Sequence, residues 1–377
     1  MRSWSVGLAA AVFAGLAAPG GASAAPGDVT LEYQCNPSGN IRFICGSAAP
    51  EDMERIPGTD WVIATGYMGR VGLRLVSVRD EKIDSIIYPS PQAEKNHDRR
   101  LYPDCPGPLS AEAEATASTH GTSLQRRPDG AWTLYVTHHG SRESVEVFKV
   151  TPMGARRPKI AWIGCVVTPD DAVLNSVAAL PDNGFAVTNS YQRDPHWEFP
   201  ATVATQEIHA SPIATAAAPG MREKRSRGEN TGYILEWRPG SGWKKLEGSD
   251  ASAPNGLTAS EDGRDVYAVY VPAGLMHLTR QAEGPPLRED VALSVRGDNV
   301  KLSPDGRRLL IGGVPVGATT FDSGRILVMD TQTLKPIQEI VSPIAAPTTA
   351  LAVGRDLWVG SGRINRIVIL PGSGGSR

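Results

Sequence analysis

Oxygen-bearing side chains recur along this sequence at the start of successive strand-like segments, and one histidine stands among them. The recurring positions are Glu51/Asp52, His120, Asn175, Asn255, Asp298/Asn299 and Thr349. Five side chains of this set offer oxygen ligands: Glu51, Asn175, Asn255, Asp298 and Asn299. Calcium takes about six to eight oxygens from carboxylates, amides, carbonyls and water, so room remains for water or a substrate oxygen. Zinc prefers histidine and cysteine. The set therefore predicts a site for a hard cation.

Asparagine and aspartate near strand starts are more often turn formers than ligands. That alternative applies to each of these residues taken alone. Their recurrence at one position of successive segments favours a shared site.

His120 stands in the same set, and an imidazole with a pKa near 6.5 suits a general base at neutral pH. A second pair of histidines, His138-His139, follows on the next strand-like run. Neighbouring residues of a strand point to opposite faces, so only one of the two can face His120. Two histidines in series could form a base and its partner.

Each recurring residue opens the same pattern of an alternating apolar stretch, an Asp-Gly-like turn and a second apolar run. The clearest copies run through Asp262-Gly263 and through Asp305-Gly306. A strand–turn–strand repeat of roughly 40–50 residues is typical of a β-propeller with one four-stranded sheet per repeat. Six copies predict an all-β, six-bladed propeller, with the opening residues gathered around its central channel.

The ends of the chain differ from the repeats. Residues 1–24 have a positive start, an apolar run and a small-residue site at Ala22-Ser23-Ala24, as in a signal peptide. We expect cleavage near Ala24 and a periplasmic or secreted protein; a retained anchor is the alternative. Residues 25–371 would form a single propeller domain, and the Gly/Ser-rich residues 372–377 a disordered tail.

Two segments interrupt the repeats, residues 90–118 and residues 190–231. Long loops in compact folds are usually functional or disordered. The aromatics Tyr191, Trp197 and Phe199 favour a lid over the channel, whereas the Ala-rich part of the second segment favours a disordered excursion. The candidate substrate-binding residues are Tyr67, Tyr191, Trp197, Phe199 and Thr349.

Composition narrows the function classes. A formal net charge of −2 gives no electrostatic reason to expect nucleic acid or an anionic membrane as partner. No G-x-S-x-G, H-E-x-x-H or P-loop motif is present, and no run after the predicted signal peptide is long enough for a transmembrane helix. Export would make Cys35, Cys45, Cys105 and Cys165 candidates for disulfides, with three possible pairings.

Taken together, these segments resemble the calcium-dependent paraoxonase/arylesterase and lactonase propellers, within the wider gluconolactonase and strictosidine-synthase-like group. The resemblance covers residues 50 to about 360 and is carried by Pro50-Glu51-Asp52-Met53, His120-Gly121-Thr122-Ser123, Tyr135-Val136-Thr137-His138, Ser144 to Lys149, Leu174 to Ala178, Val187-Thr188-Asn189, Pro254-Asn255-Gly256 and Asp298-Asn299-Val300. The motifs are weak singly and fairly specific together.

The resemblance implies two calcium ions and a His120–His138 base dyad. The catalytic ion would be held by Glu51, Asn175, Asn255, Asp298 and Asn299. A buried structural ion would use Asp52, the backbone carbonyl of Thr122 and an aspartate at the position where this chain has Ser176. A serine brings no charge, which puts the second ion in doubt.

Two further departures concern closure and substrate. The family's closing disulfide needs a cysteine near the C-terminus, and none follows Cys165. Closure must then depend on strand pairing or other disulfides. Ser190-Tyr191 replaces the family's Asp-His, so the substrate range does not carry over.

The sequence thus predicts an exported calcium-dependent hydrolase of small-molecule esters or lactones. Calcium would polarise the carbonyl, and His120, helped by His138, would activate water. The alternatives are a non-catalytic binding propeller with a structural channel metal and a gluconolactonase- or strictosidine-synthase-like enzyme. The sequence makes no prediction of oligomeric state.

Overall fold

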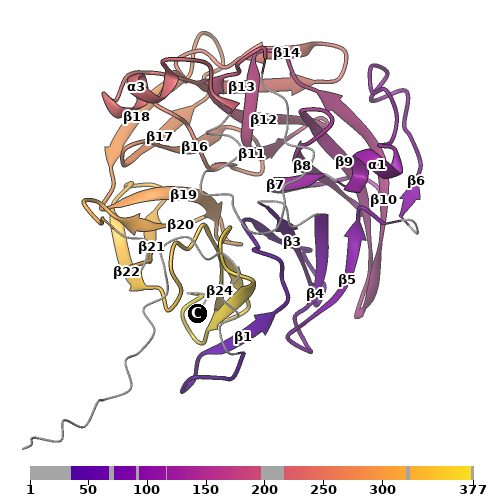
Figure 1. The fold of residues 1–377 in the computed structure, drawn as a ribbon, viewed down its shortest axis with the longest axis vertical. Helices are drawn as coiled ribbons and strands as arrows, with labels where there is room; N and C mark the ends of the chain where they lie inside the picture. The colour runs from indigo at the N-terminus through magenta and orange to yellow at the C-terminus, as the bar shows by residue number, and fades with distance from the viewer. Residues whose placement is uncertain are drawn as a thin grey trace, which may run out of the picture.

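Six antiparallel sheets stand in a ring, each roughly radial to the centre, so the predicted six-bladed β-propeller is confirmed (Figure 1). The computed structural model describes residues 35–67, 72–90, 93–115, 117–196, 216–319 and 323–374. The predicted signal peptide, residues 1–24, lies outside the described residues. So does the second half of the predicted tail, residues 375–377.

The chain forms the blades in sequence order. Blade one holds β2 (Met53–Arg55), β3 (Trp61–Gly66), β4 (Gly72–Ser77) and β5 (Lys82–Tyr88). Blade two holds β7 (Ser118–Arg126), β8 (Trp132–His139), β9 (Ser144–Met153), β10 (Arg156–Val167) and the outer β6 (Glu94–Lys95). Blade three holds β11 (Ala172–Leu180), β12 (Gly184–Gln192), β13 (Tyr233–Arg238) and β14 (Gly242–Lys245).

The second half repeats the arrangement. Blade four holds β15 (Leu257–Ala259), β16 (Asp265–Tyr270), β17 (Gly274–Thr279) and β18 (Leu287–Ala292). Blade five holds β19 (Val295–Leu302), β20 (Arg308–Pro315), β21 (Arg325–Asp330) and β22 (Pro336–Val341). Blade six holds β23 (Thr349–Val353), β24 (Asp356–Gly360), β25 (Arg366–Leu370) and β1 (Arg42–Cys45).

Strand pairing between the two ends of the described chain closes the ring. Strand β1 runs antiparallel to β25, with Arg42 opposite Ile369 and Cys45 opposite Arg366. The first strand thus completes the last blade. Strand pairing closes the ring in place of the family's disulfide, for which this chain has no C-terminal cysteine. A disulfide joins Cys45 to Cys35.

The Asp-Gly turns that marked the repeat connect the first two strands of their blades. Gly263 follows β15 with a φ of 70°, and Gly306 follows β19 with a φ of 69°. A positive φ costs glycine little because it has no Cβ, which explains why glycine recurs after the turn aspartate.

Hydroxyl side chains connect the inner parts of neighbouring blades. Thr137 on β8 donates its hydroxyl to the carbonyl of Asn175 at 2.9 Å. Thr188 on β12 donates in the same way to the carbonyl of Asn255 at 2.6 Å. The asparagines that open blades three and four are therefore each held by the second strand of the blade before.

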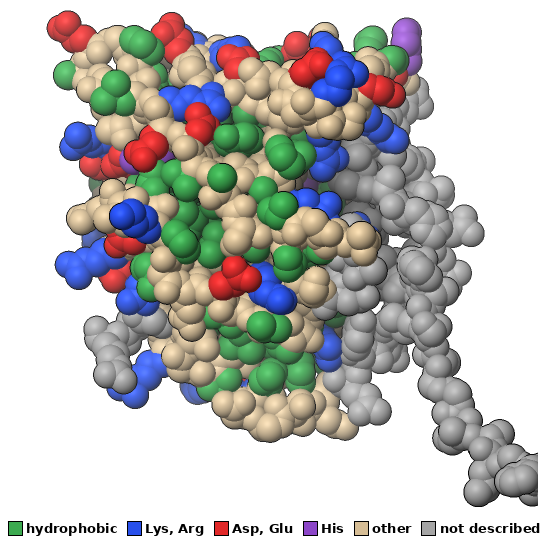
Figure 2. Space-filling model, turned by 90° about the vertical axis from the view of Figure 1, so that its left-hand side faces the viewer, with side chains coloured by type: hydrophobic (Ala, Val, Ile, Leu, Met, Phe, Trp, Pro, Cys, Tyr) green, Lys and Arg blue, Asp and Glu red, His purple; other side chains and the backbone are tan. Residues whose placement is uncertain are grey.

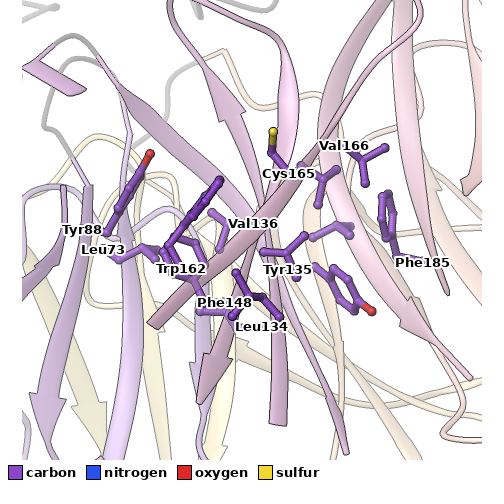
Figure 3. Close-up of a cluster of buried hydrophobic side chains, with 14 of the residues drawn as sticks. Leu73, Tyr88, Leu134, Tyr135, Val136, Phe148, Trp162, Cys165, Val166 and Phe185 are labelled. Carbon is purple, nitrogen blue, oxygen red and sulfur yellow. The ribbon is translucent and has the colours of Figure 1, made fainter. Parts of the chain in front are cut away.

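The largest apolar cluster fills the space between blades one, two and three (Figure 3). Tyr88 meets Phe148 edge-on, with ring centroids 5.1 Å apart, and Trp162 is also buried there. Tyr135 packs on Phe185 of the next blade, with centroids 5.0 Å apart. Full burial of such a side chain stabilises a fold by roughly 1.5–3 kcal/mol, so these aromatics fix the blades relative to each other.

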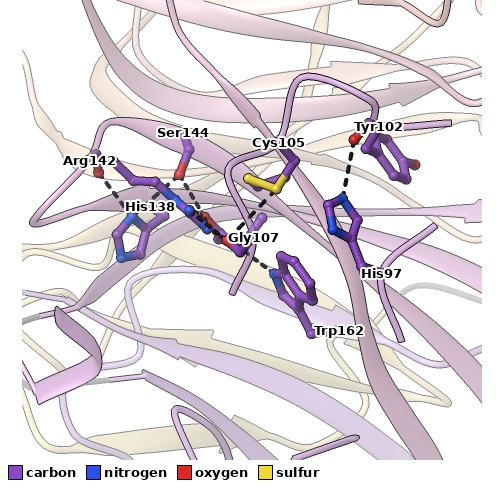
Figure 4. Close-up of a disulfide and its surroundings, with 10 residues drawn as sticks. His97, Tyr102, Cys105, Gly107, His138, Arg142, Ser144 and Trp162 are labelled. Carbon is purple, nitrogen blue, oxygen red and sulfur yellow. Dashed lines mark hydrogen bonds and ion pairs between the residues drawn. A yellow bond between two sulfur atoms is a disulfide. The ribbon is translucent and has the colours of Figure 1, made fainter. Parts of the chain in front are cut away.

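The segment at 90–118 packs beside blade two. It contains β6, which pairs in parallel with β10, and the short helix α1 (Ala111–Ala115). A second disulfide joins Cys105 in this segment to Cys165 on β10 (Figure 4). The described cysteines are thus all paired, which is compatible with export.

The second interruption lies partly outside the described residues, since 197–215 are not described, and Trp197 and Phe199 fall there. The part that follows contains α3 (Met221–Ser226). Met221 and Ala216 pack against Tyr191 and Val173, next to Ala253. The described part of the insertion thus packs against blade three and against the segment just before blade four.

The outer surface mixes apolar and charged side chains. On the face that carries the outer strands β18 and β22, hydrophobic, basic and acidic side chains are interspersed (Figure 2). The exposed apolar residues include Leu287 on β18 and Val341 on β22. Among the described residues, no helix is long and apolar enough to cross a membrane.

Candidate functional site at the innermost strands

The residues that open the blades meet at the inner ends of the sheets. Glu51, just before β2, accepts a hydrogen bond from Asn299 Nδ2 of β19 at 2.7 Å on its Oε1. The same carboxylate oxygen lies 3.4 Å from Nε2 of His120 on β7. Asp298 and Asn255 share a side-chain hydrogen bond. Blades one, two, four and five therefore contribute to one cluster.

Irregular strand pairing aims these side chains. The register of β7 shifts between Thr119 and Thr122, which brackets His120. The registers of β11 and β19 shift around Asn175 and around Asp298 and Asn299 in the same way. A bulge bends a strand locally and re-aims a side chain, so three innermost strands use one device to present their polar residues.

The backbone at the start of blade four lies very close to the backbone at the start of blade five. The N–H of Gly256 donates to the carbonyl of Asp298 at 2.9 Å. A Cβ at Gly256 would lie 2.4 Å from that oxygen and 2.4 Å from Cα of Asn299. The contact between blades four and five therefore requires glycine at position 256.

Four oxygens of the predicted ligand set are buried and have no hydrogen-bond donor. They are Glu51 Oε2, Asn175 Oδ1, Asn255 Oδ1 and Asn299 Oδ1. Buried polar atoms are normally paired, and an unpaired acceptor costs about 1–3 kcal/mol. All four belong to the predicted calcium ligands. Carboxylate and amide oxygens are what calcium prefers, so the donor set fits such an ion.

The two carboxylates are strained electrostatically when no cation is bound. Burial, and next the charge of Asp52, raise the pKa of Glu51 to about 8. Burial, and next the charge of Glu51, raise the pKa of Asp298 to about 7. A bound cation would favour both ionised forms.

Within the described ranges, no group of three or more His, Cys, Asp or Glu side chains is placed to hold a metal ion. The cluster has two carboxylates, and its other three candidate ligands are amides. A site of this composition differs from a zinc or other transition-metal centre, in which histidine and cysteine predominate.

A chain of hydrogen bonds extends from His120. Its Nδ1 lies 3.1 Å from Nε2 of His139, the last residue of β8. Nδ1 of His139 lies 2.9 Å from both carboxylate oxygens of Glu143. Glu143 also accepts the backbone N–H of Leu174 at 2.9 Å, which fixes its position. We name His120, His139 and Glu143 the histidine relay.

The relay sets the tautomers of both rings. A carboxylate accepts hydrogen bonds, so we assign Nδ1 of His139 as the donor to Glu143. Nε2 of His139 is then the acceptor for Nδ1–H of His120. This assignment leaves Nε2 of His120 as a free base beside Glu51.

His120 is neutral over the physiological pH range. Burial, followed by the neighbouring His139, lowers its pKa to about 3. Tyr67 stacks on its ring, with centroids 4.1 Å apart and planes 15° apart. The expected substrate-binding residue Tyr67 is thus buried against the imidazole and holds its orientation.

The expected contact between His120 and His138 is wrong. Nδ1 of His138 lies 3.0 Å from the carbonyl of Arg142 and 3.5 Å from Oγ of Ser144 (Figure 4). Arg142 pairs with Glu146, so His138 belongs to a separate buried network. The alternation of faces along the strand allowed either His138 or His139 to face His120. Glu143, four residues after His139, was the sequence signal that favoured His139, and it was missed.

The residues predicted for a structural ion meet an ammonium group instead. Asp52 Oδ2 and the carbonyl of Thr122 each lie 2.8 Å from Nζ of Lys301. Glu54 Oε1 lies 2.7 Å from the same nitrogen. Lys301 and Glu54 were not predicted as members of this site. Ser176 is not among the contacts of this nitrogen.

Two further candidate substrate residues, Thr349 and Tyr191, are buried and hydrogen-bonded to other residues of the fold. Thr349 is fully buried and donates its hydroxyl to Asp52 Oδ1 at 3.2 Å, so it does not face a ligand space as expected. Tyr191 is buried in the insertion, where burial raises its pKa and Arg225 hydrogen-bonds to it.

Comparison with known proteins gives no assignment. No protein-family model matches this sequence, and no curated protein matches it significantly.

Proposed function

We propose that this protein is an exported, calcium-dependent hydrolase of esters or lactones, as its resemblance to the paraoxonase/arylesterase and lactonase propellers implies. One observation carries the proposal. Unpaired buried oxygens of Glu51, Asn255 and Asn299 stand in the same cluster as Nε2 of His120, and the side-chain oxygen of Asn175 is also buried and unpaired. Such a combination suits addition of water to a carbonyl.

Calcium, held by Glu51, Asn175, Asn255, Asp298 and Asn299, would polarise the carbonyl and stabilise the developing oxyanion. Nε2 of His120 removes the proton from the attacking water. The positive charge that develops is shared with His139 through the 3.1 Å contact and is stabilised by Glu143. When the ester C–O bond breaks, His120 returns the proton to the leaving alkoxide.

Burial keeps His120 unprotonated but also weakens it as a base, so the proposed role depends on the negative charge of Glu143 behind His139. The relay supplies the negative charge that a protonated ring needs. General base catalysis of this kind contributes roughly 10²–10⁴-fold in rate. Asp298 and Glu51 act mainly as ligands.

The two disulfides support the exported location, because such bonds persist in oxidising compartments. The periplasm and the extracellular space both meet that condition.

The test is hydrolysis by the purified mature protein. Phenyl acetate and a series of lactones are assayed with calcium and with excess chelator, for the wild type and His120→Gln. We expect activity that requires calcium and falls about 10²–10⁴-fold in the variant. A protein that binds calcium but hydrolyses none of these substrates would instead be a binding propeller.

A further inference from the structure

A buried ammonium group lies where three blades meet. Lys301 is on β19 of blade five, and its side chain is 7% exposed. Its Nζ lies 2.8 Å from Asp52 Oδ2 and 2.7 Å from Glu54 Oε1, both of blade one. The third neighbour is the carbonyl of Thr122 of blade two, at 2.8 Å. A protonated lysine has three N–H donors, so each has an acceptor.

The acceptors are built for a positive charge. Asp52 is fully buried and accepts, besides Lys301, the N–H and the hydroxyl of Thr122 at 2.8 Å and 3.1 Å on the same oxygen. Its other oxygen accepts from Met53 at 2.8 Å and from Thr349. A buried carboxylate that lost its cation would be severely destabilised.

We call the predicted ligands Glu51, Asn175, Asn255 and Asn299 the outer or Glu51 layer, and Lys301 with its three neighbours the inner layer. The two layers differ in their unpaired atoms. The outer layer has four buried oxygens without a donor. In the inner layer, no buried side-chain nitrogen or oxygen of the described Asp52, Glu54, Thr122 or Lys301 lacks a partner. The outer layer is incomplete as it stands, and the inner layer is complete.

We propose that the ammonium group of Lys301 takes the place of a metal ion. It permanently occupies the inner site formed by Asp52, Glu54 and the Thr122 carbonyl. The inner layer then joins blades one, two and five without any metal ion. The protein takes up one exchangeable cation, in the Glu51 layer.

The test compares Lys301→Ala, which removes charge and volume, with Lys301→Met, which removes only the charge. Calcium is the probe. Bound calcium is counted by elemental analysis after equilibrium dialysis, and melting is followed by circular dichroism with calcium and with chelator. In chelator both variants should melt on the order of 10 °C below the wild type. Calcium should restore the alanine variant but not the methionine variant, whose side chain blocks the site.

The alanine variant should bind one calcium ion more than the wild type. This difference is expected even if the wild type binds no calcium. The count for the wild type therefore tests the outer site, and the difference between the two counts tests this proposal. Lys149→Met is the matched control, because Lys149 pairs with Asp129 on the exposed surface, and it should leave melting and calcium binding unchanged. Two calcium ions on the wild type, or equal counts for the wild type and the alanine variant, would overturn the proposal.

Discussion

His139, rather than its neighbour His138, is the hydrogen-bond partner of His120, at 3.1 Å between Nε2 and Nδ1. The contact joins the end of β8 to the bulge of β7. It leads to Glu143, whereas His138 leads to Glu146 through Ser144. Adjacent residues of one strand therefore belong to two separate polar networks.

The two histidines should differ sharply on substitution. His139→Gln breaks the relay and should lower kcat about 10²–10⁴-fold, with calcium affinity unchanged. His138→Gln should lower kcat far less, because His138 does not contact the relay. Steady-state kinetics on phenyl acetate gives the comparison, with circular dichroism as the check on folding. Equal losses in both variants would contradict the assignment of His139.

Glu143 should act through His139. Glu143→Gln keeps the side-chain size but removes the charge that stabilises a protonated His120–His139 pair. We expect kcat to fall roughly 10²–10⁴-fold while KM changes little. Glu143→Asp should recover part of the loss. A large rise in KM with kcat unchanged would show that Glu143 affects substrate binding instead.

Calcium affinity should rise with pH. Without a cation, Glu51 and Asp298 hold protons up to pH values of about 8 and 7, far above the usual range of a carboxyl. Calcium must displace those protons, so its affinity should increase from pH 6 to about pH 8 and then level off. Calorimetry in buffers of different ionisation enthalpy should detect proton release near pH 6. An affinity independent of pH would exclude these carboxylates as ligands.

The raised pKa values of Glu51 and Asp298 also determine how the stability of the metal-free protein changes with pH. The folded metal-free protein binds these protons more tightly than the unfolded chain does. Their contribution to stability is present below about pH 4 and is lost as pH rises through 7 and 8. Calcium should therefore stabilise most at alkaline pH.

Chelation should lower the melting temperature without unfolding the protein. A ligand at a hundred times its Kd stabilises the folded state by about 2.7 kcal/mol, or roughly 3–5 °C in Tm for a chain of this size. Asp298→Asn should abolish most of this difference by removing one of two charges. An unchanged Tm in excess chelator would remove calcium from the proposed function.

The two disulfides should contribute unequally. Cys105–Cys165 closes a loop with a sequence separation of 60 and is buried. Cys35–Cys45 has a separation of 10, and Cys35 is exposed. Replacing the first pair by serine should cost about 2–5 kcal/mol, and replacing the second should cost less. Urea denaturation of both variants measures the difference. The reverse order would show that closure of blade six depends on the shorter link.

The sequence carried enough information for the fold because each blade repeats one strand–turn–strand pattern. It also carried the outer layer, since Glu51, Asn175, Asn255 and Asn299 recur at one position of that pattern. The relay and Lys301 were harder to predict. The bulge between Thr119 and Thr122 interrupts the strict alternation of faces, so the partner of His120 could not be chosen by counting residues. Lys301 looked like a surface lysine, because nothing local shows that two other blades surround it.

Closure of the ring by β1 and β25 also determines when the site can exist. Glu51 follows the closing strand near one end of the chain, whereas Asn299 lies in the fifth blade, yet their side chains are 2.7 Å apart. A nascent chain that has not yet released its last blade cannot hold these residues together. Assembly of the ligand cluster must therefore come late in folding, after blade six has docked. A circular permutant that joins the two ends and opens an outer turn should reverse that order and still assemble the same cluster.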